Sequence, residues 1–134
     1  MRKFLFMTAV ALAGVTAFSL QPALAKKAAT PIATLDTDND GTVDLKEIDA
    51  SAEALFDKME KDADGTIDRK EISGRVSRKE FTAADPDKDG TLTKDEYLAK
   101  VADMFKDADP DNDGTLDADE LKSKKGKALL RAVR

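Results

Sequence analysis

Hydrophobic residues recur at helical spacing in two segments of the chain, one over positions 45–59 and one over 97–108. Successive apolar residues in each segment are mostly three or four positions apart, which places them on one face of an α-helix. We therefore predict two amphipathic helices whose apolar faces form the core. The residues of these faces are Leu45, Ile48, Ala52, Leu55, Phe56 and Met59 in the first segment and Tyr97, Val101, Met104 and Phe105 in the second.

A weaker helical pattern covers residues 72–84, where Ile72, Val76 and Phe81 are the apolar positions. Gly74 lies inside this segment, and glycine costs about 1 kcal/mol against alanine within a helix. The pattern therefore predicts a weaker or bent helix here, with Ser77 as the cap of a second turn.

The two ends of the hydrophobic pattern predict short elements. Ile32 and Leu35 indicate one helical turn packed on the core before position 36. Near the C-terminus we predict a turn that begins at Leu121 and is interrupted by Gly126, followed by a short closing helix over 129–133.

The N-terminus has the pattern of an export signal. Arg2 and Lys3 precede an apolar run of 17 residues over positions 4–20, and the small residues of Ala23-Leu24-Ala25 follow. The alternative is a retained membrane anchor, because such a run could just span a thin bilayer. Pro22 and the Ala-x-Ala site favour a signal peptide at 1–25, cleaved after Ala25. We therefore expect a periplasmic domain over 26–134 that makes no membrane contact after cleavage.

Between the hydrophobic segments, one twelve-residue acidic pattern occurs four times, at 36–47, 60–71, 85–96 and 109–120. We call these loops 1 to 4. Each has oxygen-bearing side chains at positions 1, 3, 5 and 9, Gly at position 6, Val, Ile or Leu at position 8 and Glu at position 12. This is the spacing of the EF-hand metal loop.

The spacing has a physical reason. A hard cation such as Ca²⁺ takes six to eight oxygens, and a short chain supplies them by wrapping around the ion with a backbone carbonyl at position 7 and both Glu oxygens at position 12. One acidic loop could be a solvated turn, but four copies in phase favour metal binding, with up to four ions per chain. The predicted ligands are Asp36, Asp38, Asp40, Thr42, Asp44 and Glu47 in loop 1, Glu60, Asp62, Asp64, Thr66, Asp68 and Glu71 in loop 2, Asp85, Asp87, Asp89, Thr91, Thr93 and Glu96 in loop 3, and Asp109, Asp111, Asp113, Thr115, Asp117 and Glu120 in loop 4.

The amino-acid composition excludes several kinds of active site and metal site. The 134 residues include no Cys and no His, which excludes cysteine nucleophiles, Ser-His-Asp triads and zinc sites built on nitrogen and sulfur. The formal charge is −5, or −7 for residues 26–134, without a basic face in the sequence, so nucleic acid is not an expected partner. The acidic pairs all belong to the loops, so we predict a binding protein with no catalytic residues, and we do not expect an enzyme.

The loops begin 24, 25 and 24 residues apart, which leaves only 12 or 13 residues between one loop and the next. One helix of about 18 Å, at 1.5 Å per residue, must therefore leave one loop and lead into the next. Adjacent loops then lie at opposite ends of a shared helix, so we predict that loop 1 pairs with loop 4 and loop 2 with loop 3. The predicted fold is all-α, a compact helical bundle with four peripheral metal loops.

The chain resembles the lanmodulin family, the periplasmic lanthanide-binding EF-hand proteins of methylotrophic bacteria. The resemblance covers the signal peptide, the four closely spaced loops and the Leu-rich C-terminal end, and it rests above all on Pro86 and Pro110 at loop position 2. It implies a preference for lanthanide(III) ions over Ca²⁺ and a fold that is loose without metal and compact with it. Thr37 and Lys61 stand where the family has Pro, and Glu60 replaces Asp at the first position of loop 2.

Ligand composition also ranks the loops. Thr93 at position 9 gives loop 3 one carboxylate fewer than the others, so loops 1 and 4 are predicted to be best equipped, then loop 3, with loop 2 last. Crowded carboxylates repel one another, so we expect folding and metal binding to be one event.

Other binding proteins remain as alternatives. A periplasmic calcium buffer without lanthanide selectivity fits the same loops. A target-gripping calcium sensor needs a Met-rich groove, whereas residues 26–134 contain only Met59 and Met104. A dockerin-like interface module usually closes its loops with Asp, not with the Glu found here. We expect a monomer, and the sequence identifies no protein partner.

Overall fold

A computed structural model describes residues 30–134 of the chain. The predicted signal peptide at 1–25 and its cleavage site lie outside the described residues. Within residues 30–134, no helix is both long and apolar enough to cross a membrane. The elements in chain order are α1 (Pro31–Leu35), β1 (Val43–Asp44), α2 (Leu45–Met59), β2 (Thr66–Asp68), α3 (Arg78–Ala84), β3 (Thr91–Thr93), α4 (Lys94–Ala108), β4 (Thr115–Leu116), α5 (Ala118–Lys122) and α6 (Lys124–Val133).

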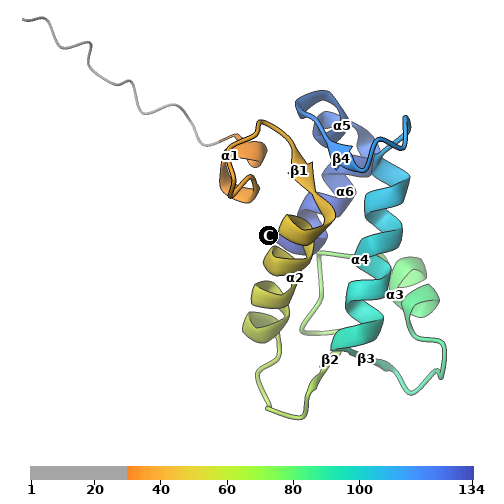
Figure 1. The fold of residues 1–134 in the computed structure, drawn as a ribbon. Coiled ribbons are helices and arrows are strands. Elements are labelled where there is room, and N and C mark those ends of the chain that lie inside the picture. Colours follow the sequence, from red (N-terminus) through yellow and green to blue (C-terminus); the bar gives the residue numbers. More distant parts are fainter. Residues whose placement is uncertain (1–29) are drawn as a thin grey trace, which may run out of the picture.

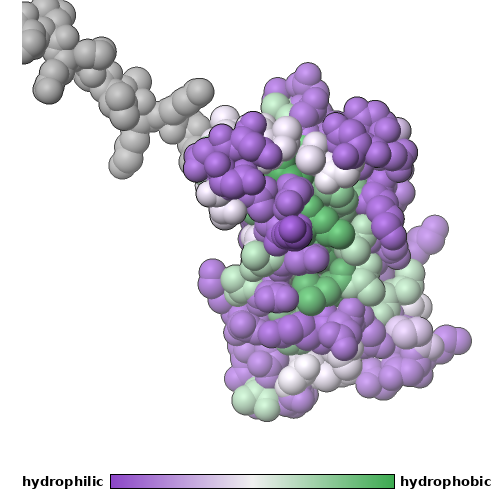
Figure 2. All heavy atoms as spheres, viewed as in Figure 1, coloured by the Kyte–Doolittle hydropathy of each residue, from purple (hydrophilic) through white to green (hydrophobic). Residues whose placement is uncertain are grey.

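The helices form a small bundle with short strands at its two ends. Helix α4 packs against both α2 and α6, and α6 also contacts α2 and α5. Strands β1 and β4 lie at one end of α2 and α4, while β2 and β3 lie at the other (Figure 1). In the view of Figure 2, hydrophilic residues cover both ends and a hydrophobic strip runs between them. The acidic loops therefore lie at the periphery, as predicted.

The strands pair as the repeat spacing predicted. Strand β1 is antiparallel to β4 with Val43 opposite Leu116, and β2 is antiparallel to β3 with Ile67 opposite Leu92. All four of these residues are buried, so each strand pair also contributes to the core. Loop 1 therefore joins loop 4 and loop 2 joins loop 3, which confirms the pairing.

The two strong amphipathic patterns form the two longest helices, which confirms their prediction. Helix α2 buries Ile48, Ala52, Leu55, Phe56 and Met59, and α4 buries Tyr97, Val101, Met104, Phe105 and Ala108. The rings of Phe56 and Tyr97 meet at 5.8 Å between centroids. The short helix α1 also forms, with Leu35 buried as expected.

The predicted helix over residues 72–84 is shortened by about half. After loop 2 the chain makes a series of turns, with the Ile72 amide 3.2 Å from the Asp68 carbonyl, and regular helix begins only at Arg78. Gly74 has φ +82°, a left-handed conformation that ends a helix. Ser77 caps α3 as predicted, because its side chain accepts from the Glu80 amide.

The prediction for the C-terminal segment was wrong about where the helix breaks. Ser123, not Gly126, separates α5 from α6, and Ser123 caps α6 by accepting from the Gly126 amide at 2.9 Å. Gly126 lies inside α6, where an added Cβ would be 2.1 Å from the Glu120 carbonyl oxygen. Glycine is therefore required here for the close approach of two helices and not for a turn.

Three elements hold the free carbonyls at the end of α6. Ser51 of α2 donates to the Val133 carbonyl at 2.7 Å. The Tyr97 hydroxyl of α4 donates to the Ala132 carbonyl, and Arg75, which follows loop 2, donates to the carbonyl oxygen of the last residue. Because α2 and α4 each connect two loops, these contacts join both ends of the bundle to the C-terminus.

The buried phenol gives a testable pH dependence. Burial raises the pKa of Tyr97 from its ordinary value of 10.0 to about 12, against a smaller lowering by Arg75. The fold favours the neutral phenol, so its contribution to stability is complete below pH 10 and falls as the pH rises towards 12. We expect the tyrosinate absorbance to titrate near pH 12 in the folded chain and near pH 10 in denaturant. The two titrations can be compared directly because the chain has one tyrosine and no tryptophan.

Candidate metal centres

The four acidic loops share one backbone conformation. Their fourth residues are Asn39, Ala63, Lys88 and Asn112, and all have φ between 57° and 62°. The glycine two residues later is also left-handed in every loop, with φ between 83° and 94°. These two positions turn the chain around a common centre. Glycine at the second position favours this conformation, whereas Ala63 and Lys88 at the first position carry no local signal for positive φ.

The carboxylates of each loop converge. In every loop, oxygen atoms of three acidic side chains lie within 4.8 Å of one another, although exposed acidic groups also gather without an ion. Positions 1, 3 and 5 meet in the first three loops, whereas positions 1, 3 and 12 meet in the fourth. The clusters are Asp36, Asp38 and Asp40; Glu60, Asp62 and Asp64; Asp85, Asp87 and Asp89; and Asp109, Asp111 and Glu120.

The first carboxylate is fixed by the glycine at position 6. Gly41, Gly90 and Gly114 each donate their amide to an oxygen of the first Asp of the loop at 3.1 Å. In loop 2 the longer Glu60 makes the same contact, with its Oε1 accepting from the Gly65 amide at 3.0 Å. Glu60 therefore reaches the position that Asp occupies in the other loops.

The threonine at position 7 has a role that the sequence did not predict. Its side chain and its amide both donate to the position-5 carboxylate, as in loop 3, where Thr91 contacts Asp89 at 2.7 and 2.8 Å. These bonds lower the pKa of Asp89, and the amide and side chain of Thr42 likewise lower that of Asp40. These bonds favour the ionised form of Asp40 and Asp89.

The predicted ligands at position 9 also make capping contacts. In three loops the position-9 residue is the N-cap of the helix that follows: Asp44 for α2, Thr93 for α4 and Asp117 for α5. Each of these side chains accepts a hydrogen bond from the amide of the Glu at position 12, which we call the closing Glu. That Glu accepts in return from the amide of the cap, which completes a capping box. Asp68 makes the same pair of bonds with Glu71 ahead of the turns that follow loop 2. Position 9 therefore fixes the closing Glu and lies outside the carboxylate clusters.

Neighbouring charges act on the remaining carboxylates. The Asp40 amide lowers the pKa of Asp38, but desolvation and the carboxylates of Asp40, Glu47 and Asp36 outweigh it and raise the pKa overall. In loop 4 the Asp117 amide lowers the pKa of Glu120, while desolvation and the carboxylates of Asp111, Asp117 and Asp109 raise it overall. Negative charge is therefore concentrated where the carboxylates converge.

Three buried carboxylate oxygens within residues 30–134 have no protein partner, and they belong to Asp49, Asp85 and Asp109. Asp49 lies in α2, outside the loops. Asp85 and Asp109 are only 6% and 5% exposed, and their Oδ1 atoms accept no hydrogen bond in the described part of the chain. A buried carboxylate oxygen without a partner is costly unless a cation compensates it. Asp85 and Asp109 both belong to acidic clusters of oxygen-only ligands, which is the chemistry that Ca²⁺ and other hard ions take. The residues of loops 3 and 4 fit such an ion.

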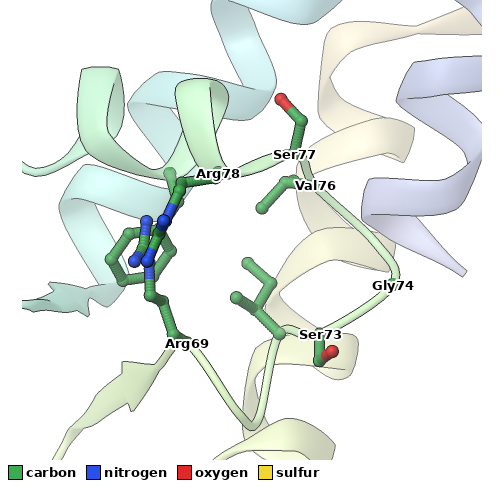
Figure 3. Close-up of a pocket in the computed structure, with 8 residues that line it drawn as sticks. Arg69, Ser73, Gly74, Val76, Ser77 and Arg78 are labelled. Carbon is green, nitrogen blue, oxygen red and sulfur yellow. The ribbon is translucent and has the colours of Figure 1, made fainter.

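A separate hollow of about 290 Å³ lies where loop 2 joins α3 (Figure 3). Arg69, Ser73, Val76 and Arg78 are among its lining residues, and the Arg69 guanidinium lies 5.3 Å from the centre of the Phe81 ring. No carboxylate lines it, so this hollow does not belong to the acidic clusters.

Three segments of the chain match the family described as EF hand, at residues 33–50, 78–99 and 101–123. These segments contain loops 1, 3 and 4, whereas loop 2 lies outside them. No curated protein matches the chain. Together with the acidic clusters, the three matches support an EF-hand protein that binds calcium or another metal.

Proposed function

We propose that this EF-hand protein is a periplasmic metal-binding protein that takes up to four hard cations, prefers lanthanide(III) ions to Ca²⁺, and folds as it binds them. The observation that carries the metal proposal is the pair of buried, unpartnered oxygens of Asp85 and Asp109 inside acidic clusters. The EF-hand matches around the same loops support it independently.

The proposed ligands are the same in kind in all four loops. The carboxylates at positions 1, 3, 5 and 12 supply most oxygens, and the carbonyl at position 7 supplies one. The capping contacts keep the closing Glu beside the loop, where both of its oxygens can turn to the ion. The side chain at position 9 contributes negative charge in loops 1, 2 and 4, and it orients the closing Glu in all four.

The lanthanide preference is the finer part of the proposal. A trivalent ion gains half as much Coulomb energy again as a divalent ion from the same carboxylates, because the energy scales with the product of the charges. It also loses more hydration energy, so charge alone does not fix the order of affinities. Support for the preference comes from Pro86 and Pro110, the feature shared with the lanmodulin family.

A calcium-binding protein without lanthanide selectivity is the second candidate. Loops 1 and 2 favour it, because Thr37 and Lys61 replace the proline that marks the resemblance. The EF-hand matches support calcium binding as well as they support any other hard ion.

Terbium luminescence separates the two candidates. Tyr97 directly follows the closing Glu96 of loop 3 and is the one tyrosine of a chain without tryptophan, so its ring can sensitise Tb³⁺ in that loop. We expect strong Tb³⁺ emission on tyrosine excitation that persists in millimolar Ca²⁺. Ready displacement by Ca²⁺ would instead favour the calcium-binding protein.

Two control variants identify the source of the signal. Tyr97→Phe removes the donor and should abolish the emission while Tb³⁺ still binds. Glu96→Gln removes a proposed ligand charge and should weaken Tb³⁺ binding in loop 3 while the donor remains. Emission that is unchanged in Glu96→Gln would place the ion elsewhere and contradict the site.

A further inference from the structure

The four closing glutamates fall into two groups by the contacts of their Oε1 atoms. In loop 1, Glu47 Oε1 accepts from the Thr37 amide at 2.5 Å and from the Thr37 hydroxyl at 2.9 Å. In loop 2, Glu71 Oε1 accepts from the Lys61 amide at 3.0 Å. Because Oε2 of each Glu is also held by the position-9 amide, both carboxylate oxygens are hydrogen-bonded in these loops.

Loops 3 and 4 lack this contact for a covalent reason. Position 2 is Pro86 in loop 3 and Pro110 in loop 4, and proline has no backbone N–H to donate. Glu96 and Glu120 accept through Oε2 from the position-9 amide at 2.8 and 2.9 Å. Their Oε1 atoms accept no hydrogen bond within residues 30–134.

At position 1, loop 1 differs from loops 3 and 4, while in loop 2 only one oxygen of Glu60 accepts a hydrogen bond. In loop 1 both oxygens of Asp36 are hydrogen-bonded, to the amides of Asp40 and Gly41 at 3.2 and 3.1 Å. Asp85 and Asp109 use Oδ2 in this way, while their Oδ1 atoms are buried without a partner. Loops 3 and 4 thus have two free carboxylate oxygens each, one from position 1 and one from position 12.

We propose that the position-2 residue sets the order in which the loops fill. In loops 1 and 2 its amide holds Oε1 of the closing Glu, a contact that we call the latch, so an ion competes with that hydrogen bond for the second oxygen. In loops 3 and 4 no position-2 amide contacts the closing Glu, which we call unlatched, and the buried Oδ1 of the first Asp already lacks a partner. Loops 3 and 4 therefore fill first and loops 1 and 2 second. The inference rests on the proposed metal-binding function, and it reverses the rank that ligand composition gave to loop 1.

Strand pairing distributes the two kinds of loop evenly. Unlatched loop 4 pairs with latched loop 1 through β4 and β1, and unlatched loop 3 pairs with latched loop 2 through β3 and β2. Each end of the bundle therefore has one early site and one late site. The first two ions occupy opposite ends of the molecule.

Proline substitution can remove the latches without a change of backbone shape. The first residues of loops 1 and 2, Asp36 and Glu60, have ψ of 96° and 115°. Those of loops 3 and 4, Asp85 and Asp109, have ψ of 84° and 87° and already precede proline. In all four loops the residue before position 2 is thus outside the α region, which a following proline disfavours.

The order can be read from the amides of the four loop glycines, Gly41, Gly65, Gly90 and Gly114, in a ¹⁵N-edited NMR titration with La³⁺. We expect the loop 3 and loop 4 glycines to shift with the first two equivalents and the other two with the next two. If all four shift together, or if the glycines of loops 1 and 2 shift first, the proposed order is overturned while metal binding stands. If none shifts, the proposed function itself fails.

Variants at position 2 test the cause. Thr37→Pro together with Lys61→Pro should raise the La³⁺ affinity of loops 1 and 2 by about threefold to tenfold, since an exposed hydrogen bond contributes modestly and tenfold corresponds to about 1.4 kcal/mol. Thr37→Ser with Lys61→Ala is the matched control, because it keeps both amides and the hydroxyl that contacts Glu47, and it should leave the order unchanged. The reverse pair, Pro86→Ala with Pro110→Ala, restores the amides and should move loops 3 and 4 towards the late group. An unchanged order in both proline-changing pairs would contradict the latch even if one of them folded poorly.

Discussion

Removing bound metal with a chelator should lower both the helix content and the melting temperature of residues 26–134. An ion that binds only the folded state adds about 4 kcal/mol of stability when its free concentration is 1,000 times the dissociation constant. The metal-free fold must instead hold four clusters of carboxylates with oxygens within 4.8 Å of one another. Its core has 22 buried apolar residues within 30–134, which is modest for a domain whose stability is marginal in any case. Circular dichroism melts at increasing La³⁺ or Ca²⁺ concentration measure the effect.

A variant that lacks the position-3 carboxylates separates charge repulsion within the loops from other effects of the chelator. The position-3 carboxylates Asp38, Asp62, Asp87 and Asp111 are all exposed, so their replacement by Asn leaves the core intact. We expect this variant to melt at a higher temperature than the metal-free parent and to gain less on addition of metal. A metal-free parent that is already fully helical, with a melting temperature indifferent to La³⁺ and Ca²⁺, would contradict the coupling of folding to binding.

The features that the sequence predicted correctly depend on periodicity. Helices α2 and α4 follow from apolar residues at helical spacing, because one buried face is enough to define each helix. The pairing of loops 1 and 4 follows from the short repeat, since a shared helix places consecutive loops at opposite ends. Neither result needs knowledge of a contact between distant side chains.

The prediction that failed concerns Gly126, because the role of a glycine depends on what lies beside it. Gly74 and Gly126 carry the same local signal, yet Gly74 ends the turns after loop 2 in a left-handed conformation while Gly126 lies within a helix. The difference is the backbone of α5, which approaches Gly126 closely and has no counterpart at Gly74. Such an approach becomes visible only when two helices are placed in space.

In the candidate sites too, the sequence identified residues but not the contacts between distant parts of the chain. Position and spacing identified the carboxylates that the structure brings together in each loop, including those of loop 2 beyond the EF-hand matches. They did not identify the amide contacts of Thr37 and Lys61, because these join residues ten positions apart in a folded loop. The position-9 side chains were predicted as ligands, and their capping role required the following helix to be seen.

Replacement of Gly126 by alanine should lower the free energy of unfolding by about 1–3 kcal/mol, the usual cost of overpacking a tightly packed position. An added Cβ would lie 2.1 Å from the Glu120 carbonyl oxygen and 2.6 Å from the Leu121 Cα, and backbone atoms cannot swing aside as a side chain can. Helix α5 must therefore move away from α6. Denaturant unfolding of the metal-loaded chain measures the loss.

Lys127→Ala is the matched control, because Lys127 is the next residue of α6 and is exposed. We expect it to change stability by no more than about 0.5 kcal/mol, as surface substitutions usually do. The displaced backbone in Gly126→Ala includes Glu120, the closing carboxylate of loop 4, so that loop should also lose metal affinity while loop 3 keeps it. Equal stability of Gly126→Ala and Lys127→Ala would show that α5 and α6 separate freely. Glu120 would then not depend on their contact for its position in loop 4.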